Sequence, residues 1–456
     1  MSPARRPWIV LMTLATSLAG CVTAPRPLEP KSTSVFPLGV YWPGEYTYQD
    51  AGDTEKRWQR VEATLDRLAH DGINTVWLTH LPAGDTARFA RLADARGIRL
   101  VAAIAELAGN VPDVRKGDVH RLRDQTLAAW GDAPPPLAWG LGDEPRTAAM
   151  EEMIPHVTAW RAAGQPTAIV LMPADLAAGA RLLPLRYLCA DVYPFFSSGN
   201  PNGPNQHAAS VGYFIQAARR TVDLAAQHGL QPWIMAQSFQ EPWGAFDFDA
   251  AGNVIYLPGG GPHWRMPTPA EVRWQTWAAV ATGARGVFHF SLHLGMRRPA
   301  KVQPLPPDSP IAVRVETPTG LPAGMLYLDG QPTRVYEAMA ESYRQIQQVA
   351  RYLVAMRPSR DTFAFLAKGS PEPGTLATCF RDPGGHAFVI VVNGNVYAAE
   401  EVAVNVEREF TVAYDLVARR PVDLLDREVK AYEPIGPFRQ ARLRLEPGGG
   451  TVLQLQ

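Results

Sequence analysis

Short apolar runs alternate with segments of helical periodicity along most of the chain. The helical segments place apolar residues three or four positions apart, as at Trp58, Val61, Leu65 and Leu68. This alternation is typical of βα units. Eight strands are expected, over residues 36–42, 73–79, 98–105, 137–142, 166–171, 186–192, 232–237 and 286–291.

Eight strands with helices between them predict a (β/α)8 barrel over residues 35–357, with its last helix over residues 334–356. Parallel strands that are covered on both faces need such near-continuous apolar character. A doubly wound open sheet is the alternative fold. It is disfavoured, together with a nucleotide cofactor, because no G-x-G-x-x-G turn follows the first strand.

After Pro358 the pattern changes from helical to alternating. Strands are expected over residues 387–392, 402–406, 410–414, 442–445 and 451–456. We therefore predict an antiparallel β-sandwich over residues 358–456 as a second domain. Packing against the barrel is its simplest role, and a separate sugar-binding role is the alternative.

The first residues are not expected to belong to the fold. Arg5 and Arg6 precede an apolar run over residues 8–19, which is too short to span a bilayer. The run ends at Leu18-Ala19-Gly20-Cys21. This segment resembles the lipobox of bacterial lipoproteins, in which the cysteine becomes the lipidated first residue of the mature protein.

The lipobox resemblance implies a signal peptide over residues 1–21, a lipid on Cys21 and an extended tether over residues 22–34. The membrane would then be reached through this anchor only. Val22 stands where an aspartate would retain a lipoprotein at the inner membrane, so the outer membrane of the cell envelope is expected. An ordinary secretory signal with a chance cysteine is the alternative.

Composition narrows the possible partners. The formal net charge of +0 gives no reason to expect a nucleic-acid surface. The sequence contains 12 tryptophans, enough to suggest aromatic platforms of the kind that bind sugar rings, in addition to core packing. Cys189 and Cys379 lie in different predicted domains, and two buried free thiols are expected. The pattern predicts no particular oligomeric state.

Acids and aromatic residues follow the carboxyl ends of the expected strands, which meet at one end of a barrel. Three acids are the candidates for catalysis: Glu144, Asp191 and Glu241. The side chains expected to bind substrate are Tyr41, Trp42, Glu45, His80, Glu106, Asp143, Tyr193, Gln237, Trp243, Trp264 and His293.

Such a set of residues suits cleavage of a glycosidic bond in a carbohydrate. One carboxylic acid protonates the leaving oxygen, and a second carboxylate attacks the anomeric carbon or activates a water. Adjacent residues at the end of a strand point in different directions, so only one of Asp143 and Glu144 is expected to lead into the pocket. No metal is expected, because the histidines are scattered and no H-E-x-x-H motif occurs.

The predicted barrel resembles clan A of the glycoside hydrolases over roughly residues 36–356. In that clan the acid/base glutamate follows strand four, commonly as Asn-Glu-Pro, and this chain has Asp143-Glu144-Pro145. The run from Ala190 to Pro194 and the segment from Arg265 to Gly286 are similar to the clan and to its unassigned relatives. The resemblance implies a glycosidase without a cofactor, with Glu144 as the proton donor.

One position departs from the clan. Its nucleophile is a glutamate at the end of strand seven, where this chain has Gln237. A glutamine can only hydrogen-bond a substrate hydroxyl or orient a water. The second carboxylate is therefore expected at Asp191 or Glu241, with Glu106 and Glu45 as further possibilities.

Two other functions stay open. A non-catalytic glycan-binding lipoprotein on the same barrel would explain the glutamine at strand seven. An envelope scaffold lipoprotein would instead contact a protein, and it predicts an exposed apolar patch on the sandwich and no carboxylate cluster at the barrel mouth.

Overall fold

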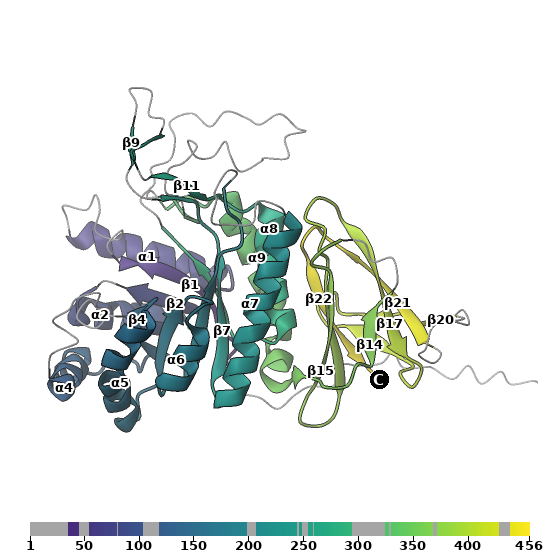
Figure 1. The fold of residues 1–456 in the computed structure, drawn as a ribbon, viewed down its shortest axis with the longest axis horizontal. Helices are drawn as coiled ribbons and strands as arrows, with labels where there is room; N and C mark the ends of the chain where they lie inside the picture. The colour runs from purple at the N-terminus through teal and green to yellow at the C-terminus, as the bar shows by residue number, and fades with distance from the viewer. Residues whose placement is uncertain are drawn as a thin grey trace, which may run out of the picture.

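The barrel occupies the first part of the computed structural model, which describes residues 35–44, 54–79, 81–103, 118–197, 207–243, 246–248, 254–258, 260–293, 324–327, 330–367, 372–427 and 438–456. Eight parallel strands close in the order β1-β12-β7-β6-β5-β4-β3-β2 (Figure 1). Their bounds are β1 (Leu38–Pro43), β2 (Thr75–Thr79), β3 (Arg99–Ala103), β4 (Ala138–Asp143), β5 (Thr167–Leu171), β6 (Tyr187–Val192), β7 (Gln231–Gln237) and β12 (Val287–Phe290). Closure between Leu38 on β1 and Val287 on β12 confirms the (β/α)8 barrel and excludes the open sheet.

The strands are nearly continuous apolar runs because both of their faces are buried. Tyr41, Trp77 and Phe288 pack with one another inside the barrel. The intervening residues, such as Val40 and Val76, belong to the larger core between the strands and the surrounding helices. Aromatic rings therefore fill the interior, so the barrel is a packed core with no channel along its axis.

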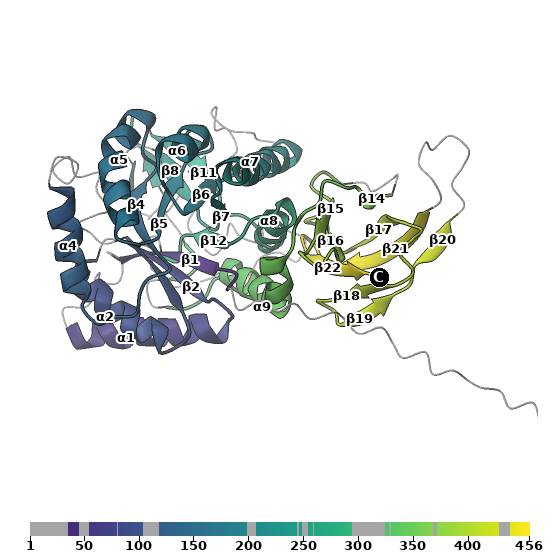
Figure 2. The ribbon, with the colours of Figure 1, turned by 90° about the horizontal axis from the view of Figure 1, so that it is seen from below.

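Helices surround the barrel (Figure 2). Their bounds are α1 (Thr54–His70), α2 (Ala83–Asp94), α4 (Val119–Trp130), α5 (Thr147–Ala162), α6 (Leu176–Leu182), α7 (His207–His228), α8 (Pro269–Thr282) and α9 (Arg334–Ala355). α1 buries the expected stripe of Trp58, Val61, Leu65 and Leu68. α8 is buried almost all round, because it lies between the barrel and the second domain (Figure 2).

The connection from β7 to α8, residues 238–268, contains short strands where the sequence predicts a loop. These are β8 (Glu241–Trp243), β9 (Phe246–Phe248), β10 (Val254–Tyr256) and β11 (Gly261–Trp264). They form two antiparallel pairs, β8 with β11 and β9 with β10, beyond the carboxyl ends of the barrel strands (Figure 1). Segments this short carry too little alternation to be recognised in the sequence.

Two antiparallel sheets follow the barrel and confirm the expected sandwich. Their strands are β13 (Arg357–Pro358), β14 (Ala364–Leu366), β15 (Leu376–Arg381), β16 (Ala387–Val392), β17 (Glu400–Glu407), β18 (Ala413–Asp415), β19 (Arg420–Val422), β20 (Leu425–Arg427), β21 (Phe438–Leu445) and β22 (Gly450–Leu455). The sheet orders are β13-β15-β16-β22-β18-β19 and β14-β17-β21-β20. Val389, Val404 and Leu443 are among the residues that fill the core between the sheets.

The sandwich packs on the barrel through α8 and α9. The indole nitrogen of Trp274 donates to the carbonyl of Gly374 across 3.0 Å, and Arg273 Nε donates to the carbonyl of Pro447 across 3.0 Å. The two buried cysteines, Cys189 in the barrel and Cys379 in the sandwich, are free thiols, as expected.

The predicted signal peptide, Cys21 and the tether lie outside the described residues. Within the described part of the chain, no helix has both the length and the apolar character to cross a membrane.

Candidate active site

The acids predicted from the sequence gather at the carboxyl ends of the barrel strands. Asp143 ends β4 and Glu144 follows it, Asp191 lies on β6, and Glu241 begins β8 four residues after β7 ends. Glu45, His80 and Glu106, which were also expected here, lie outside the described residues.

The backbone is irregular at the end of β4, where Asp143 and Glu144 lie. The pairing of β4 with β5 shifts register between Gly140 and Asp143, and Glu144 adopts a left-handed conformation with φ of 44°. A bulge re-aims side chains, and left-handed backbone is costly for a residue other than glycine. Both residues are exposed, and the charges of both raise the pKa of Asp191.

Asp191 is the buried acid of the cluster, with an exposed fraction of 4%. Burial raises the pKa of its carboxyl group well above the ordinary value, and a hydrogen bond to Glu144 and the charges of Glu144 and Asp143 raise this pKa further. Its Oδ1 atom has no hydrogen-bond partner among the described residues. Burial and the neighbouring negative charges therefore favour the protonated form of Asp191.

Glu241 approaches this pair from the β7–α8 connection. Its side chain is half-buried, and burial followed by the charge of Glu144 raises the pKa of its carboxyl group. The contacts of the described residues include no hydrogen bond between Glu241 and Glu144. The charge of Glu144 therefore acts on both Asp191 and Glu241.

Two tyrosines border the acids. Tyr41 is buried, and its hydroxyl donates to Asp143 Oδ2 across 3.3 Å. Tyr193 follows β6, and burial together with the charges of Asp191, Glu144 and Asp143 raises the pKa of its phenol well above the ordinary value. The phenol of Tyr193 therefore stays protonated and can donate a hydrogen bond at any pH near neutrality.

Aromatic rings form one wall beside Tyr193. The ring centroid of Tyr193 lies 4.9 Å from that of Phe239 and 5.7 Å from that of Trp264, edge to face in both pairs. Trp264 is half-buried and stands opposite Glu241 in the β8–β11 pair. Trp243 lies on β8, but its side chain is outside the described part of the structure. An aromatic surface next to carboxyl groups is the setting that recognition of a sugar ring needs.

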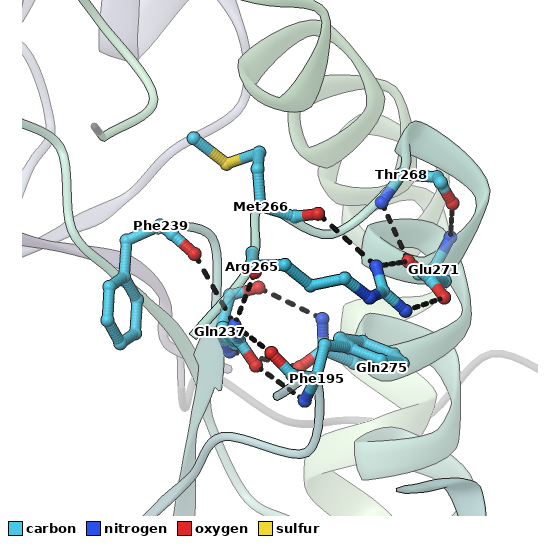
Figure 3. A network of polar contacts seen from close by, with 8 residues as sticks. All are labelled: Phe195, Gln237, Phe239, Arg265, Met266, Thr268, Glu271 and Gln275. Carbon is cyan, nitrogen blue, oxygen red and sulfur yellow. Dashed lines mark hydrogen bonds and ion pairs between the residues drawn. The ribbon is translucent and has the colours of Figure 1, made fainter. Parts of the chain in front are cut away.

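Gln237 is fully buried, and its side-chain amide hydrogen-bonds to main-chain groups (Figure 3). Its Oε1 accepts from the N–H of Phe195 across 2.8 Å. Its Nε2 donates to the carbonyls of Phe195 and Arg265 across 3.1 and 2.8 Å. The amide therefore has no group left for a substrate hydroxyl, and the expected role as a substrate ligand is not what its contacts support. Instead, Gln237 ties the start of the β7–α8 connection to its end.

The end of this connection is held by an ion pair between the buried Glu271 and the half-buried Arg265 (Figure 3). Arg265 binds both carboxylate oxygens of Glu271, at 2.7 and 2.8 Å. Glu271 also accepts from the N–H of Thr268, whose hydroxyl accepts from the N–H of Glu271, and this capping box begins α8. The Arg-Met-Pro-Thr-Pro segment that resembles clan A is thus explained by local structure.

Trp42 and His293 lie behind the site. Trp42 has an exposed fraction of 2%, and its ring packs edge-on against Phe89 and His293 at 5.0 and 5.9 Å. A ring that is buried in this way is not a platform for a sugar. Burial lowers the pKa of His293 to about 4, so its imidazole is neutral at neutral pH.

The sequence interpretation missed three residues. His289 on β12 is fully buried, hydrogen-bonded to Ser238 and Thr276, and burial lowers its pKa to about 3. It holds the residue after Gln237 against α8. Phe239 and Phe290 complete the aromatic wall, and the peptide bond after Phe290 is cis. A signal existed for Phe290, which ends an aromatic strand, but none for His289.

The described residues contain no group of three or more His, Cys, Asp or Glu side chains that could hold a metal ion. The site can donate and accept protons through the carboxyl groups of Glu144, Asp191 and Glu241 and the phenols of Tyr41 and Tyr193. This is the chemistry of general acid–base catalysis.

Comparison with known proteins shows that the chain is similar in fold to solved structures. No protein-family model matches the sequence, and no curated protein matches it. A solved structure described as a glycoside hydrolase is 14% identical with a TM-score of 0.50, and the match covers 92% of each chain. The GH51 arabinofuranosidase from Xanthomonas axonopodis pv. citri is 12% identical with a TM-score of 0.48, over 94% of this chain and 98% of that one. A GH5_18 protein from Bifidobacterium longum subsp. longum, in complex with Manb1-4GlcNAc, is 12% identical with a TM-score of 0.45, over 68% and 78%. Across 92% of both chains, the chain therefore has the fold of a solved glycoside hydrolase structure.

Proposed function

We propose that this protein hydrolyses a glycosidic bond in an oligo- or polysaccharide, with Glu144 as the proton donor and Glu241 as the second carboxylate. The observation that supports the proposal is that Glu144, Asp191 and Glu241 lie at the carboxyl ends of the barrel strands, close enough for the charge of Glu144 to raise the pKa of both other carboxyl groups. A carboxylic acid at this position can protonate a leaving oxygen.

The burial of Asp191 argues against it as the second carboxylate, because burial favours its protonated form and only an ionised carboxylate can attack the anomeric carbon or activate a water. In glycosidases the two catalytic carboxyl groups stand about 5–5.5 Å apart for retention and about 6.5–9.5 Å apart for inversion, because the sugar lies between them. Glu241 is only half-buried and lies within reach of the charge of Glu144, which favours it as the nucleophile or base.

Asp191 then acts on Glu144 and not on the substrate's anomeric carbon. Burial favours the protonated form of Asp191, so its carboxyl group can donate a hydrogen bond to the carboxylate that Glu144 becomes when Glu144 gives its own proton to the leaving oxygen. After transfer to the leaving group, Glu144 is the more exposed carboxylate and can accept a proton from water. Tyr193 can donate to whichever carboxylate carries the charge.

A carbohydrate is the substrate class that the aromatic wall favours. Trp264 lies opposite Glu241 in the β8–β11 pair and contacts the ring of Tyr193, so a sugar ring packed against this wall would lie beside Glu241. The GH5_18 structure that is similar in fold was solved with a disaccharide.

The decisive experiment is turnover of a glycan and aryl-glycoside panel by Glu144→Gln and Glu241→Gln, with Glu151→Gln on the exposed face of α5 as the matched control. Glu144→Gln should lower kcat by at least about hundredfold on poor leaving groups. It should lose much less on dinitrophenyl glycosides, whose leaving oxygen needs no proton. The proposal fails if Glu144→Gln turns over a confirmed substrate like the unchanged protein.

A non-catalytic glycan-binding protein is the second candidate. It is favoured by Gln237, because the strand-seven position holds no carboxylate and its amide is used by the main chain. Glycan binding without release of reducing sugar would decide for it. An envelope scaffold is disfavoured by the carboxyl groups gathered at the barrel mouth.

We also propose a cell-envelope location, with a lipid on Cys21 as the only membrane attachment. The support is the sequence alone, Leu18-Ala19-Gly20-Cys21 after a short apolar run. Labelling with a fatty acid in cells should mark the full-length protein and should be absent from Cys21→Ala. Equal labelling of Cys21→Ala would reject the anchor.

A further inference from the structure

A cavity of about 550 Å³ lies at the end of the barrel away from the candidate active site. It opens where β3, β4, β5 and β6 begin, which is the end opposite to β9 and β11 in Figure 1. Its walls are Arg99, Pro136, Leu137, Arg161, Gly164, Gln165, Pro166, Thr167, Pro184, Leu185, Arg186, Tyr187 and Gly229.

Arginine is the only charged residue type in these walls. Arg99 begins β3, Arg161 lies in the last turn of α5, and Arg186 directly precedes β6, so three different elements each contribute an arginine to one cavity. None of them forms an ion pair with a carboxylate of the described residues. Other exposed arginines of the barrel do, as Arg91 does with Asp132 at 3.2 Å. The positive charge of the cavity is therefore not neutralised within the described structure.

Apart from Gln165 and Thr167, the remaining walls are mostly apolar, and they are firmly held. Tyr187 stacks on Trp233 with ring centroids 4.0 Å apart, and its hydroxyl accepts a hydrogen bond from Arg186 Nε across 3.3 Å. Prolines at positions 136, 166 and 184 fix the backbone just before three of the strands. Arg186 is thus positioned by a rigid ring, which lowers the entropic cost of binding a ligand.

We infer that this cavity binds a ligand that carries an oxyanion, as a phosphate, sulfate or carboxylate group. Guanidinium groups match such oxyanions in two-point hydrogen bonding, and several unpaired ones around one cavity disfavour a neutral or cationic ligand. A volume of this size admits a body larger than the anion itself, and the proline, leucine and tyrosine walls offer that body an apolar surface. The inference does not depend on the proposed hydrolase activity, because the cavity lies at the other end of the barrel.

The test is binding of three probes to the full chain at low ionic strength. Inorganic phosphate and glucuronate are titrated by calorimetry, and phosphatidylcholine vesicles with and without phosphatidylglycerol are tested by co-sedimentation. Phosphate binding indicates a free or phosphorylated small molecule, glucuronate an acidic sugar, and vesicles alone a lipid headgroup. Each of these supports an oxyanion site, and binding should weaken as salt is added.

The variants locate the binding. Exchanging Arg99, Arg161 and Arg186 together for glutamine should weaken the observed binding by at least about tenfold. Arg161→Lys keeps the charge but loses the planar fork, and an intermediate loss is expected. The matched control is Arg181→Gln, an equally exposed arginine in the last turn of α6 that does not line the cavity, and its affinity should stay within about twofold.

These exposed positions tolerate glutamine without loss of fold, which unchanged thermal midpoints of the variants would verify. The site is rejected if no probe binds the unchanged protein. It is equally rejected if the triple variant binds as tightly, or if Arg181→Gln loses as much affinity as the triple variant.

Discussion

The side-chain amide of Gln237 donates a hydrogen bond to the carbonyl of Arg265 across 2.8 Å, and this bond joins the two ends of the β7–α8 connection. The connection carries Glu241 and Trp264, so the position of both depends on how its ends are held. The end of β7 therefore carries Gln237, which clamps the connection, in place of a carboxylate. The carboxylate of Glu241, four residues later, lies near Glu144.

Gln237→Glu should destabilise the protein and should not restore a strand-seven nucleophile. The new carboxylate would lose the donated hydrogen bonds and would face the carbonyls of Phe195 and Arg265 without water. We expect the free energy of unfolding to fall by about 3 kcal/mol, measured by denaturant unfolding. Gln227→Glu, on the exposed side of α7, is the matched control and should change stability by less than about 0.5 kcal/mol. An unfolding curve of Gln237→Glu equal to that of the control would contradict the clamp.

Glu271→Gln should also destabilise the protein, by loosening Arg265 at the end of the β7–α8 connection. Arg265 would keep its charge while losing the bidentate partner, and burial disfavours an unpaired guanidinium. Because the Arg265 side chain is 35% exposed, water partly screens its unpaired charge, and a loss of about 1 to 2 kcal/mol is expected. A double-mutant cycle with Gln237→Ala should show coupling, since both side chains hold Arg265. Simple additivity of the two losses would show that the clamp and the ion pair act separately.

The eight barrel strands could be predicted because each is buried on both faces and therefore reads as an apolar run. The role of Gln237 could not, because its partners Phe195 and Arg265 are 42 and 28 residues away along the chain. The same holds for His289, whose partner Ser238 is 51 residues distant. The hydrophobic pattern of a sequence indicates which face of a helix or strand a residue occupies. It does not indicate which group, distant along the chain, the residue contacts.

The site was predictable in its residue types and not in its local geometry. Strand ends placed Glu144 and Asp191 on one rim of the barrel, since parallel strands end together. The left-handed backbone at Glu144 and the register shift before Asp143 are set by pairing with β5, and a sequence pattern of period two cannot reveal them. The burial of Asp191, which favours Glu241 as the second carboxylate, likewise depends on tertiary packing that the sequence pattern does not show.

Asp191 should make stability depend on pH. Its pKa is raised in the folded state, so the folded protein binds this proton more tightly than the unfolded chain does. The stabilisation is fully present below the unfolded value of 3.8 and is lost as the pH rises through the folded value. Asp191→Asn, which cannot ionise, should therefore gain thermal stability relative to the unchanged protein as the pH rises from about 5 to about 8.

Asp66→Asn is the control for this pH series. Its carboxylate has a lowered pKa because of a hydrogen bond to Arg96, so its effect should not grow over the same range. A constant difference between Asp191→Asn and the unchanged protein over the range would contradict the raised pKa.

Tyr193→Phe should lower turnover while leaving the fold intact. The ring contacts with Phe239 and Trp264 do not involve the hydroxyl, so thermal stability should stay close to that of the unchanged protein. If the phenol donates to the carboxylates during the reaction, kcat should fall by about tenfold to hundredfold with little change in KM. The reverse pattern, a raised KM at unchanged kcat, would assign Tyr193 to substrate binding alone.

The kinetic signatures of Asp191→Asn and Glu241→Gln should differ, because the first acts on the proton donor and the second on the anomeric carbon. Asp191→Asn should shift the high-pH limit of kcat while retaining measurable turnover, since Glu144 remains in place. Glu241→Gln should lose activity at every pH, and the loss should be as large on dinitrophenyl glycosides as on poor substrates, because leaving-group protonation is not the missing step. Azide supplied to Glu241→Gly should restore turnover in part by replacing the carboxylate. Restoration in Asp191→Gly together with none in Glu241→Gly would move the second carboxylate to Asp191 and place Glu144 across from it in the bound state.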